Sequence, residues 1–246
     1  MWLAAITPLL VFSAFLLLLL VSLSVPVTHT IYVLRLTASV GTSFLAASAG
    51  AVAHFGVWGY CISSINVSIA GLSDGTHTQL CSAPRLGYDF DSTVQSALRA
   101  QDVDPSALSR ELTAVLVLHP IACGFAFLAL LASLSIFRWH RLSTRPGPRS
   151  RSHGRGRALI WTTLALTLLA ALLTTVVFLF DVIFVAVAKH RIADDSGGAV
   201  SGTWGNAVWM VLGAAIALWL ALTSALIVLI RGRGRSRETR KSASNY

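Results

Sequence analysis

The sequence predicts an all-α membrane protein, a bundle of four transmembrane helices with a small, partly β loop between the first two. Three observations support this class. Apolar residues make up 55% of the chain and charged residues only 12%, whereas a soluble domain has roughly 25% charged residues. Four long segments contain almost no charge, and each exceeds the roughly 18 residues that indicate a transmembrane helix. The basic residues are concentrated in two short blocks, which is typical of segments on the cytoplasmic side of a membrane.

The order of these segments gives the predicted organisation of the chain. It is helix 1–27, outer loop 28–111, helix 112–137, arginine-rich cytosolic loop 138–157, helix 158–188, short outer loop 189–206, helix 207–230 and basic cytosolic tail 231–246. The first helix resembles a secretory signal in its position. However, it has no positively charged start, its apolar core is too long, and no cleavage site is convincing. We therefore expect it to remain as a membrane span.

A fifth segment, 41–62, also carries no full charge, but we do not predict a span there. Its Ala, Ser and Gly residues insert weakly compared with Leu or Phe, and its later half is rich in aromatics and favours a strand. If it did insert, the N-terminus would lie outside and the rest of the topology would be unchanged. Strands are thus predicted at Ile31–Leu36 and Val52–Ile62. Helices are predicted to begin at Asp91 and at Pro105, the latter continuing into the second span.

The arginines set the predicted orientation. The loop 138–157 has seven arginines and no acid, and the tail after Ile230 has six basic residues and one glutamate. Because basic residues near span ends stay in the cytosol, both termini are predicted to be cytosolic. We expect the loop to contact the anionic inner leaflet, at roughly 1 kcal/mol per residue, and not to bind nucleic acid. The members of this basic cluster are Arg138, Arg141, Arg145, Arg149, Arg151, Arg155 and Arg157.

The outer loop contains two cysteines that we expect to form a disulfide. Cys61 and Cys81 pass through an oxidising compartment during export, where such thiols normally pair. A bridge closing a loop of this size contributes about 3 kcal/mol. Cys123 lies in the second span and is expected to act as a small buried hydrophobe. The cysteines lack neighbouring ligands at metal-binding spacing, so neither a metal nor another cofactor is expected.

Asn66 begins the sequence Asn-Val-Ser, a site for N-glycosylation on the outer side of the membrane. Such a short match also arises by chance. Occupancy of Asn66 is therefore left open.

Two titratable side chains lie deep within the predicted spans. His119 in the second and Asp181 in the third are each roughly seven or eight residues from the outer surface, about 10 to 12 Å at the helical rise. A charged side chain costs about 2.5 to 3.5 kcal/mol at the bilayer centre, so we expect this intramembrane polar pair to be in contact. The contact is first a structural prediction. Because histidine titrates most easily near neutral pH, the pair is also a candidate pH-sensing element.

The sequence contains no motif for catalysis. We find no Gly-x-Ser-x-Gly, His-Glu-x-x-His or glycine-rich phosphate loop. A transporter or channel needs polar residues along a path through its spans, and the two available ones both lie near the outside. We therefore expect a non-enzymatic protein that acts through membrane partners.

A run of aromatic residues and glycines precedes the first outer cysteine. It comprises Phe55, Gly56, Trp58, Gly59, Tyr60 and Cys61. With Cys81 in the same loop, this run resembles the signature of the fungal PalI group, a branch of the claudin-like four-span proteins. Similar pieces follow in the same order at Val117–Pro120, at Phe180–Ile183 and at Trp204–Gly205. The resemblance covers the whole chain, although only the Gly-Tyr-Cys element is fairly specific by itself.

The resemblance implies a claudin-like bundle with a disulfide-bonded outer loop in the plasma membrane. It also implies an accessory role, in which the protein supports a seven-span receptor for ambient pH. The related Sur-type members organise plasma-membrane domains and cell-wall morphology, and this is the alternative. An apolar insert at about Thr37–Ala53 and a wide cysteine spacing depart from the pattern of the group.

Overall fold

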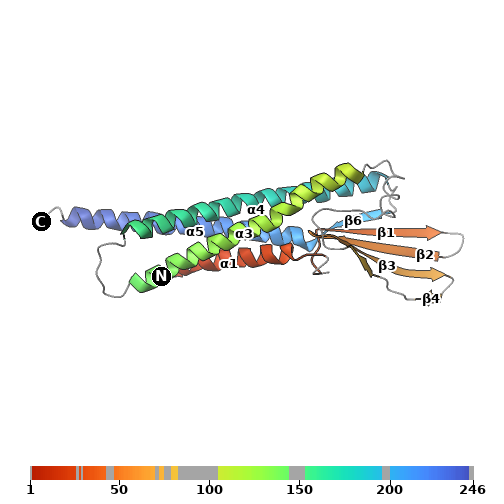
Figure 1. The fold of residues 1–246 in the computed structure, drawn as a ribbon, viewed down its shortest axis with the longest axis horizontal. Coiled ribbons are helices and arrows are strands. Elements are labelled where there is room, and N and C mark those ends of the chain that lie inside the picture. Colours follow the sequence, from red (N-terminus) through yellow and green to blue (C-terminus); the bar gives the residue numbers. More distant parts are fainter. Residues whose placement is uncertain are drawn as a thin grey trace. The chain divides into compact units, whose positions relative to one another are not determined.

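The computed structural model describes residues 2–25, 28, 30–42, 47–69, 72–74, 79–82, 105–143, 153–195 and 200–243 (Figure 1). Most of these residues lie in long helices. The helices are α1 (Trp2–Ser22), α3 (Pro105–Ser143), α4 (His153–Asp195) and α5 (Asn206–Ala243). These helices contain the uncharged, apolar segments of the sequence.

Three helices in the described part of the chain are long and apolar enough to cross a membrane. Their apolar segments are Val117–Ile136, Ala158–His190 and Asn206–Ile230. The apolar part of α1, Ile6–Ser22, is shorter. Large apolar side chains such as Leu9 are exposed on the helices, as expected where lipid is the solvent.

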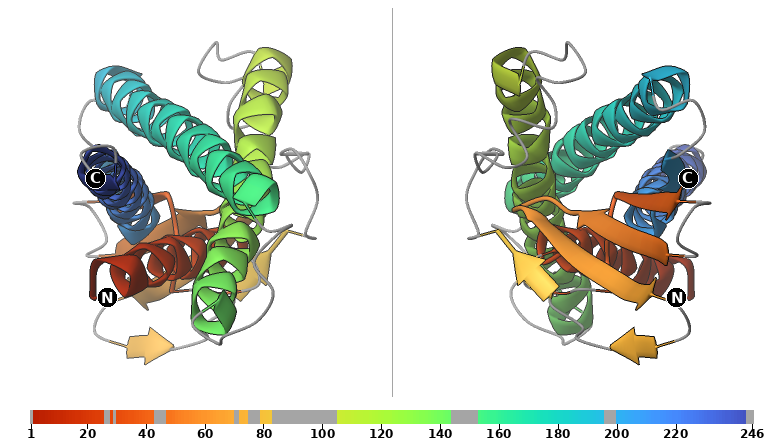
Figure 2. Two further views of the ribbon diagram at one scale, coloured as in Figure 1. Left: turned by 90° about the vertical axis from the view of Figure 1, so that its left-hand side faces the viewer. Right: turned by 90° about the vertical axis from the view of Figure 1, so that its right-hand side faces the viewer.

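An antiparallel sheet forms the second part of the fold. Its strands are β1 (Leu34–Thr42), β2 (Ala47–Phe55), β3 (Tyr60–Ile69), β4 (Leu72–Asp74), β5 (Gln79–Cys81) and β6 (Val200–Trp204). They follow the order β4-β3-β2-β1-β6, and β5 also pairs with β3. The ribbon in Figure 2 shows β1, β2 and β3 side by side, with the twist usual for neighbouring strands.

The sheet confirms that the predicted outer loop is partly β and that the described part of 41–62 forms strands. The predicted strand Val52–Ile62 is, however, interrupted. The amide of Gly56 donates to the carbonyl oxygen of Gly59 at 2.9 Å, and this turn separates β2 from β3. The first strand begins at Leu34, three residues later than predicted.

The ends of the helices also differ from the predicted loops. As predicted, α3 begins at Pro105 and continues through the second apolar segment, whereas Asp91 lies outside the described residues. Between 189 and 206 we predicted only a short loop. In the structure, α4 continues to Asp195 and β6 occupies Val200–Trp204. Arginine and lysine are good helix formers, and both occur where α4 and α5 extend beyond their uncharged segments.

The described contacts divide the chain into two compact units. Unit 1 comprises Met1–Leu18, Ile121–Thr175 and Leu212–Tyr246, and unit 2 comprises Leu19–Pro120 and Val176–Val211. Each helix contributes residues to both. Unit 2 contains the whole sheet.

Small and apolar side chains fill the core of unit 1. Val11 of α1, Ala129 and Leu130 of α3 and Ala221 of α5 are buried in one cluster. A Cβ atom at Gly213 of α5 would lie 3.5 Å from Leu17 of α1. Small residues allow membrane helices to approach closely, which explains the tight packing of α1 on α5.

Candidate functional site

Residues of the aromatic and glycine run contact the segment that connects α1 to β1, Ser22–Val33. We call it the α1–β1 junction. The amide of Val57 donates to Ser24 Oγ at 2.9 Å, and the amide of Trp58 donates to the carbonyl oxygen of Val25 at 3.3 Å. The indole Nε1 of Trp58 donates to the carbonyl oxygen of Ser22. Carbonyls at a helix end lack partners within the helix, so the turn after β2 caps α1.

Gly56 explains why this turn contains glycine. A Cβ atom built at Gly56 would lie 2.6 Å from both the Cβ atom and the carbonyl oxygen of Val25. Such distances are far shorter than van der Waals contact. Only glycine lets the two backbones approach this closely.

A second group of residues holds the same junction from the start of α5. The amide of Gly205 donates to the carbonyl oxygen of Val33 at 2.9 Å. Asn206 Oδ1 accepts from the amide of Tyr32 at 3.1 Å, and Asn206 Nδ2 donates to the carbonyl oxygen of Thr30 at 2.8 Å. A Cβ atom at Gly205 would lie 1.9 Å from the Tyr32 carbonyl oxygen. The α1–β1 junction is therefore fixed by β2–β3 on one side and by β6–α5 on the other.

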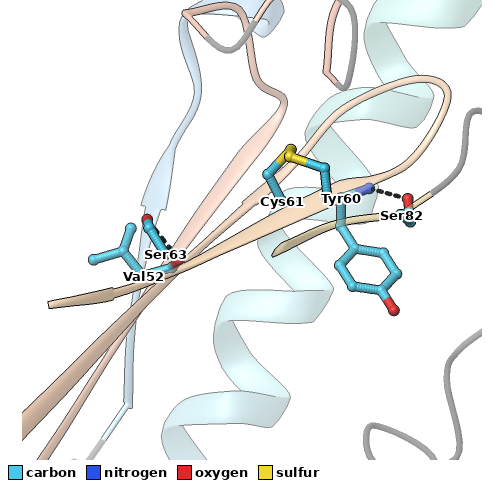
Figure 3. Close-up of a disulfide and its surroundings, with 6 residues drawn as sticks. Val52, Tyr60, Cys61, Ser63 and Ser82 are labelled. Carbon is cyan, nitrogen blue, oxygen red and sulfur yellow. Dashed lines mark hydrogen bonds between the residues drawn. A yellow bond between two sulfur atoms is a disulfide. The ribbon is translucent and has the colours of Figure 1, made fainter. Parts of the chain in front are cut away.

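The predicted disulfide between Cys61 and Cys81 is present. The two cysteines lie directly opposite each other on β3 and β5. Next to the bridge, the amide of Tyr60 donates to Ser82 Oγ at 3.0 Å, and the Tyr60 ring points away from the sulfur atoms (Figure 3). The bridge thus attaches the short strand β5 to β3.

The predicted contact between His119 and Asp181 is also present. His119 Nε2 of α3 lies 3.1 Å from Asp181 Oδ2 of α4. The side chains are only 1% and 3% exposed. His119 Nδ1 is buried and has no hydrogen-bond partner among the described residues. The pair therefore ties α3 to α4 inside unit 2, through a polar contact that has little competition from water.

A pair of basic residues on the sheet was not predicted from the sequence. Arg35 of β1 and His54 of β2 are directly opposite each other, so both side chains lie on one face. Burial lowers the pKa of His54 below its ordinary value of 6.5, and the positive charge of Arg35 lowers it further. The ring of Tyr32 meets that of His54 edge-on, with centroids 4.7 Å apart. Strand register brought these residues together, and the sequence pattern alone did not contain that register.

The other predicted site residues lie apart from these groups. Asn66 is in β3, and Cys123 is buried in α3 outside the disulfide. Among the residues that the structure describes, no group of three possible ligands could hold a metal ion.

The basic cluster is only partly described. Arg138 is exposed near the end of α3, which also contains Arg141, and α4 begins with a turn that contains Arg155 and Arg157. Outside the described residues lie Arg145, Arg149 and Arg151.

Apolar helices that can cross a membrane, joined to a disulfide-bonded antiparallel sheet, fit an integral membrane protein of claudin-like fold. The model of the SUR7/PalI family matches residues 3–230, so this chain belongs to the SUR7/PalI family. The resemblance found in the sequence is thereby confirmed at the level of the family, which is not known as a family of enzymes. No curated protein gives a significant match.

Proposed function

We propose that this protein is a four-span accessory protein of the plasma membrane that supports a seven-span receptor for ambient pH. The observation that carries this proposal is the contact between His119 and Asp181 at 3.1 Å. The two residues belong to Val117–Pro120 and Phe180–Ile183, the two intramembrane pieces that resemble the PalI group. Because the two residues form one buried pair, both pieces contribute to the same contact between α3 and α4.

The length of α1 supports a fourth span. This helix has 21 residues, which correspond to about 31 Å at the helical rise and match a hydrocarbon core of about 30 Å. It contains no charged residue, and Leu9, Phe12 and Leu20 are exposed. These side chains would face lipid.

The disulfide and the arginine-rich segments together support the proposed orientation of the protein in the membrane. A stable disulfide requires an oxidising compartment, so the sheet with Cys61 and Cys81 would lie outside the cell. The arginine-rich ends of α3 and α5 would lie in the cytosol, next to the anionic leaflet. Both termini would then be cytosolic.

In this proposal the protein positions a partner and does not transform a substrate. The α1–β1 junction is fixed by hydrogen bonds from two directions, which gives the sheet a defined attachment to the ends of α1 and α5. A sheet held in this way would offer outer loops of the receptor a preorganised surface, which reduces the entropic cost of binding. The His119–Asp181 pair would keep α3 and α4 in register below it.

The alternative is a Sur-type organiser of membrane domains and cell-wall morphology. Its support is the family match, which covers both branches equally. The two functions differ in their dependence on pH. An accessory of a pH receptor is needed under alkaline conditions, whereas an organiser is needed at every pH.

A deletion strain separates the two proposals. We expect loss of the protein to abolish growth and pH signalling at alkaline pH, to leave growth at acidic pH unchanged, and to be reversed by the wild-type gene. Affinity purification of the tagged protein from membranes should recover a seven-span partner. Altered membrane patches and wall defects at both pH values, without a seven-span partner, would instead favour the organiser.

A further inference from the structure

Arg35 and His54 form a site with the positive charge of Arg35 and with no counter-ion among the residues that the structure describes. Arg35 Nε and His54 Nδ1 are both buried and lack hydrogen-bond partners in the described part of the chain. No described carboxylate forms an ion pair with Arg35. The two residues as a whole are nevertheless partly exposed, so the site borders on solvent. Burying a polar N–H group without a hydrogen-bond partner is costly, and an anion bound next to Arg35 Nε would offset that cost.

The register of the sheet defines how this site is built. Arg35 faces Thr203 of β6 on one side and His54 of β2 on the other, and His54 in turn faces Cys61 of β3. Residues paired in this way share one face of the sheet. Lys189 lies on the opposite face, since it is placed over the ring of Trp204 at 5.8 Å.

The position of the site along α5 indicates which anion it meets. Arg35 is opposite Thr203, three residues before Asn206, where the apolar segment of α5 begins. At the rise of a strand, this separation is at most about 10 Å. The headgroup layer on each side of the hydrocarbon core is about 5 to 8 Å thick, and an arginine side chain readily reaches into it. If the apolar segment of α5 begins at the edge of the hydrocarbon core, the site would lie within reach of the lipid phosphates.

Two further features mark the same depth. Tyr32 contacts the ring of His54, and Trp204 follows Thr203 in β6 with its side chain on the other face of the sheet. Tryptophan and tyrosine rings prefer the membrane interface. The apolar segment of α4 ends at His190, next to Lys189, which contacts Trp204. Thus the ends of two apolar helical segments meet the sheet at the level of Arg35.

We propose that Arg35 and His54 bind the phosphate group of a phospholipid in the leaflet next to the sheet. The guanidinium supplies a planar set of donors that matches phosphate oxygens, and such charge-assisted hydrogen bonds are about twice as strong as neutral ones. His54 adds a donor and, when protonated, a second positive charge. The bound lipid would fasten the sheet to the membrane surface, independently of which side of the membrane the sheet occupies and of any receptor.

Binding should strengthen as the pH falls. Protonation of His54 is opposed by its burial and by Arg35 in the empty site, and a bound phosphate would offset both effects. The ring of Tyr32 also packs against His54, edge-on, with the ring centroids 4.7 Å apart. On β3, the residue opposite His54 is Cys61, which forms the disulfide and does not titrate. Affinity should therefore increase as the pH falls through and below 6.5, the ordinary pKa of His54.

The test uses the full chain in dodecyl maltoside without phosphate and follows the imidazole NMR signal of His54, assigned by its loss in His54→Gln. We expect dioctanoyl phosphatidylglycerol to shift this signal saturably, more tightly at pH 5.5 than at pH 7.5. Dioctanoylglycerol, which lacks the phosphate, should leave it unchanged. Arg35→Gln should weaken the binding about 10-fold or more, the loss expected for a hydrogen bond to a charged group.

Matched variants make the test specific. Lys189→Gln removes one positive charge on the other face of the sheet and should keep the binding. Arg35→Lys keeps the charge without the planar donors and should bind with an intermediate affinity, which also covers the case in which Arg35→Gln does not fold. The proposal fails if phosphatidylglycerol does not shift the His54 signal, or if Arg35→Gln folds and responds as the wild type does. Equal binding of inorganic phosphate would show a free-anion site and would overturn the assignment to lipid.

Discussion

At the scale of the single residue, Gly205 has the closest neighbouring backbone atoms among five glycines compared in the described part of the chain. A Cβ atom there would lie 1.9 Å from the carbonyl oxygen of Tyr32 and 2.5 Å from that of Val33. Both contacts are with backbone atoms, so a shift would disturb the hydrogen bond between Gly205 and Val33. The identity of this residue is thus set by the path of the α1–β1 junction.

We expect Gly205→Ala to lower the free energy of unfolding by about 2 kcal/mol or more, as overpacking a tight site does. Gly124 of α3 provides the control, because nothing lies within 4 Å of a Cβ atom built there. Gly124→Ala should stabilise the helix by up to about 1 kcal/mol. Thermal unfolding of both variants in detergent measures the difference. Equal melting temperatures would show that the junction yields easily.

His119 and Asp181 depend on each other, because each is almost completely buried. We expect His119→Leu to destabilise the protein by about 1 to 3 kcal/mol, since it leaves the carboxyl of Asp181 without its partner. The double variant His119→Leu, Asp181→Leu removes both polar groups and should regain much of this loss. Unfolding in detergent and the amount of protein at the cell surface are the two readouts. Strictly additive effects of the two substitutions would contradict a direct coupling.

The shifted titration of His54 predicts how the stability of the protein depends on pH. Burial, and then Arg35, lower the pKa of His54 below 6.5 in the folded state, so the unfolded chain binds this proton more readily. The stability contributed by neutral His54 is complete above 6.5 and is lost as the pH falls from there towards the folded-state pKa. Unfolding at pH 7.5 and pH 5, without added lipid, should show this loss. In His54→Gln the difference should become smaller, and an unchanged difference would assign it to other groups.

At the scale of the element, the bridge between Cys61 and Cys81 holds β5 on β3. The cysteines are separated by 20 residues, so their replacement by serine should cost about 3 kcal/mol of stability. A thiol count tests the pairing directly. The denatured, unreduced wild type should expose only the thiol of Cys123, and reduction should add two more. Three reactive thiols before reduction would exclude the bridge.

The helices could be predicted from sequence because their signal is local. Uncharged segments of sufficient length identify α3, α4 and α5 without knowledge of any partner. The contact between His119 and Asp181 could be predicted because the two residues lie at similar depths within two of these segments. The helical rise converts a residue count into a distance along the membrane normal, so two polar groups at equal depth could be paired before the fold was known.

The sheet was predicted less completely because its pairing is not local. Leu34 pairs with Trp204, far away in the sequence, and β6 is too short to stand out within its loop. The interruption of the predicted strand Val52–Ile62 could have been recognised from the sequence. Gly56 and Gly59 inside an apparent strand are typical of a turn or a close backbone approach, and both occur here. The pairing of Arg35 with His54 depends on the exact register, which hydrophobic patterns specify only where one face is buried.

At the scale of the whole molecule, the disulfide-bonded sheet and the arginine-rich helix ends require different chemical surroundings. Cys61 and Cys81 need an oxidising compartment to stay paired. The arginine-rich ends of α3 and α5 are favoured next to an anionic, cytosolic leaflet. The helical parts between these regions contain the apolar segments Val117–Ile136 and Asn206–Ile230. The four-span topology that we propose would satisfy both requirements at once and would leave the two termini on the same side.

Epitope tags test this arrangement in intact cells. One tag is inserted after Pro148, in the arginine-rich loop, and a second after Asp91, between the disulfide and α3. We expect antibody to label the second tag in intact cells and the first only after the cells are permeabilised, because positive charges near span ends resist transfer across the membrane. Replacing Arg138, Arg141, Arg155 and Arg157 by glutamine should weaken this preference.

Each tagged protein must first prove to be folded, and the thiol count with one reactive cysteine before reduction serves as that control. Labelling of the tag after Pro148 in intact cells would place the arginines outside and the cysteines in a reducing cytosol, where the Cys61–Cys81 bridge would not persist. An accessory that meets a receptor outside the cell through its sheet would then be impossible. The lipid site at Arg35 would survive this outcome, because it depends only on the distance between the sheet and the start of α5, so the two proposals stand or fall separately.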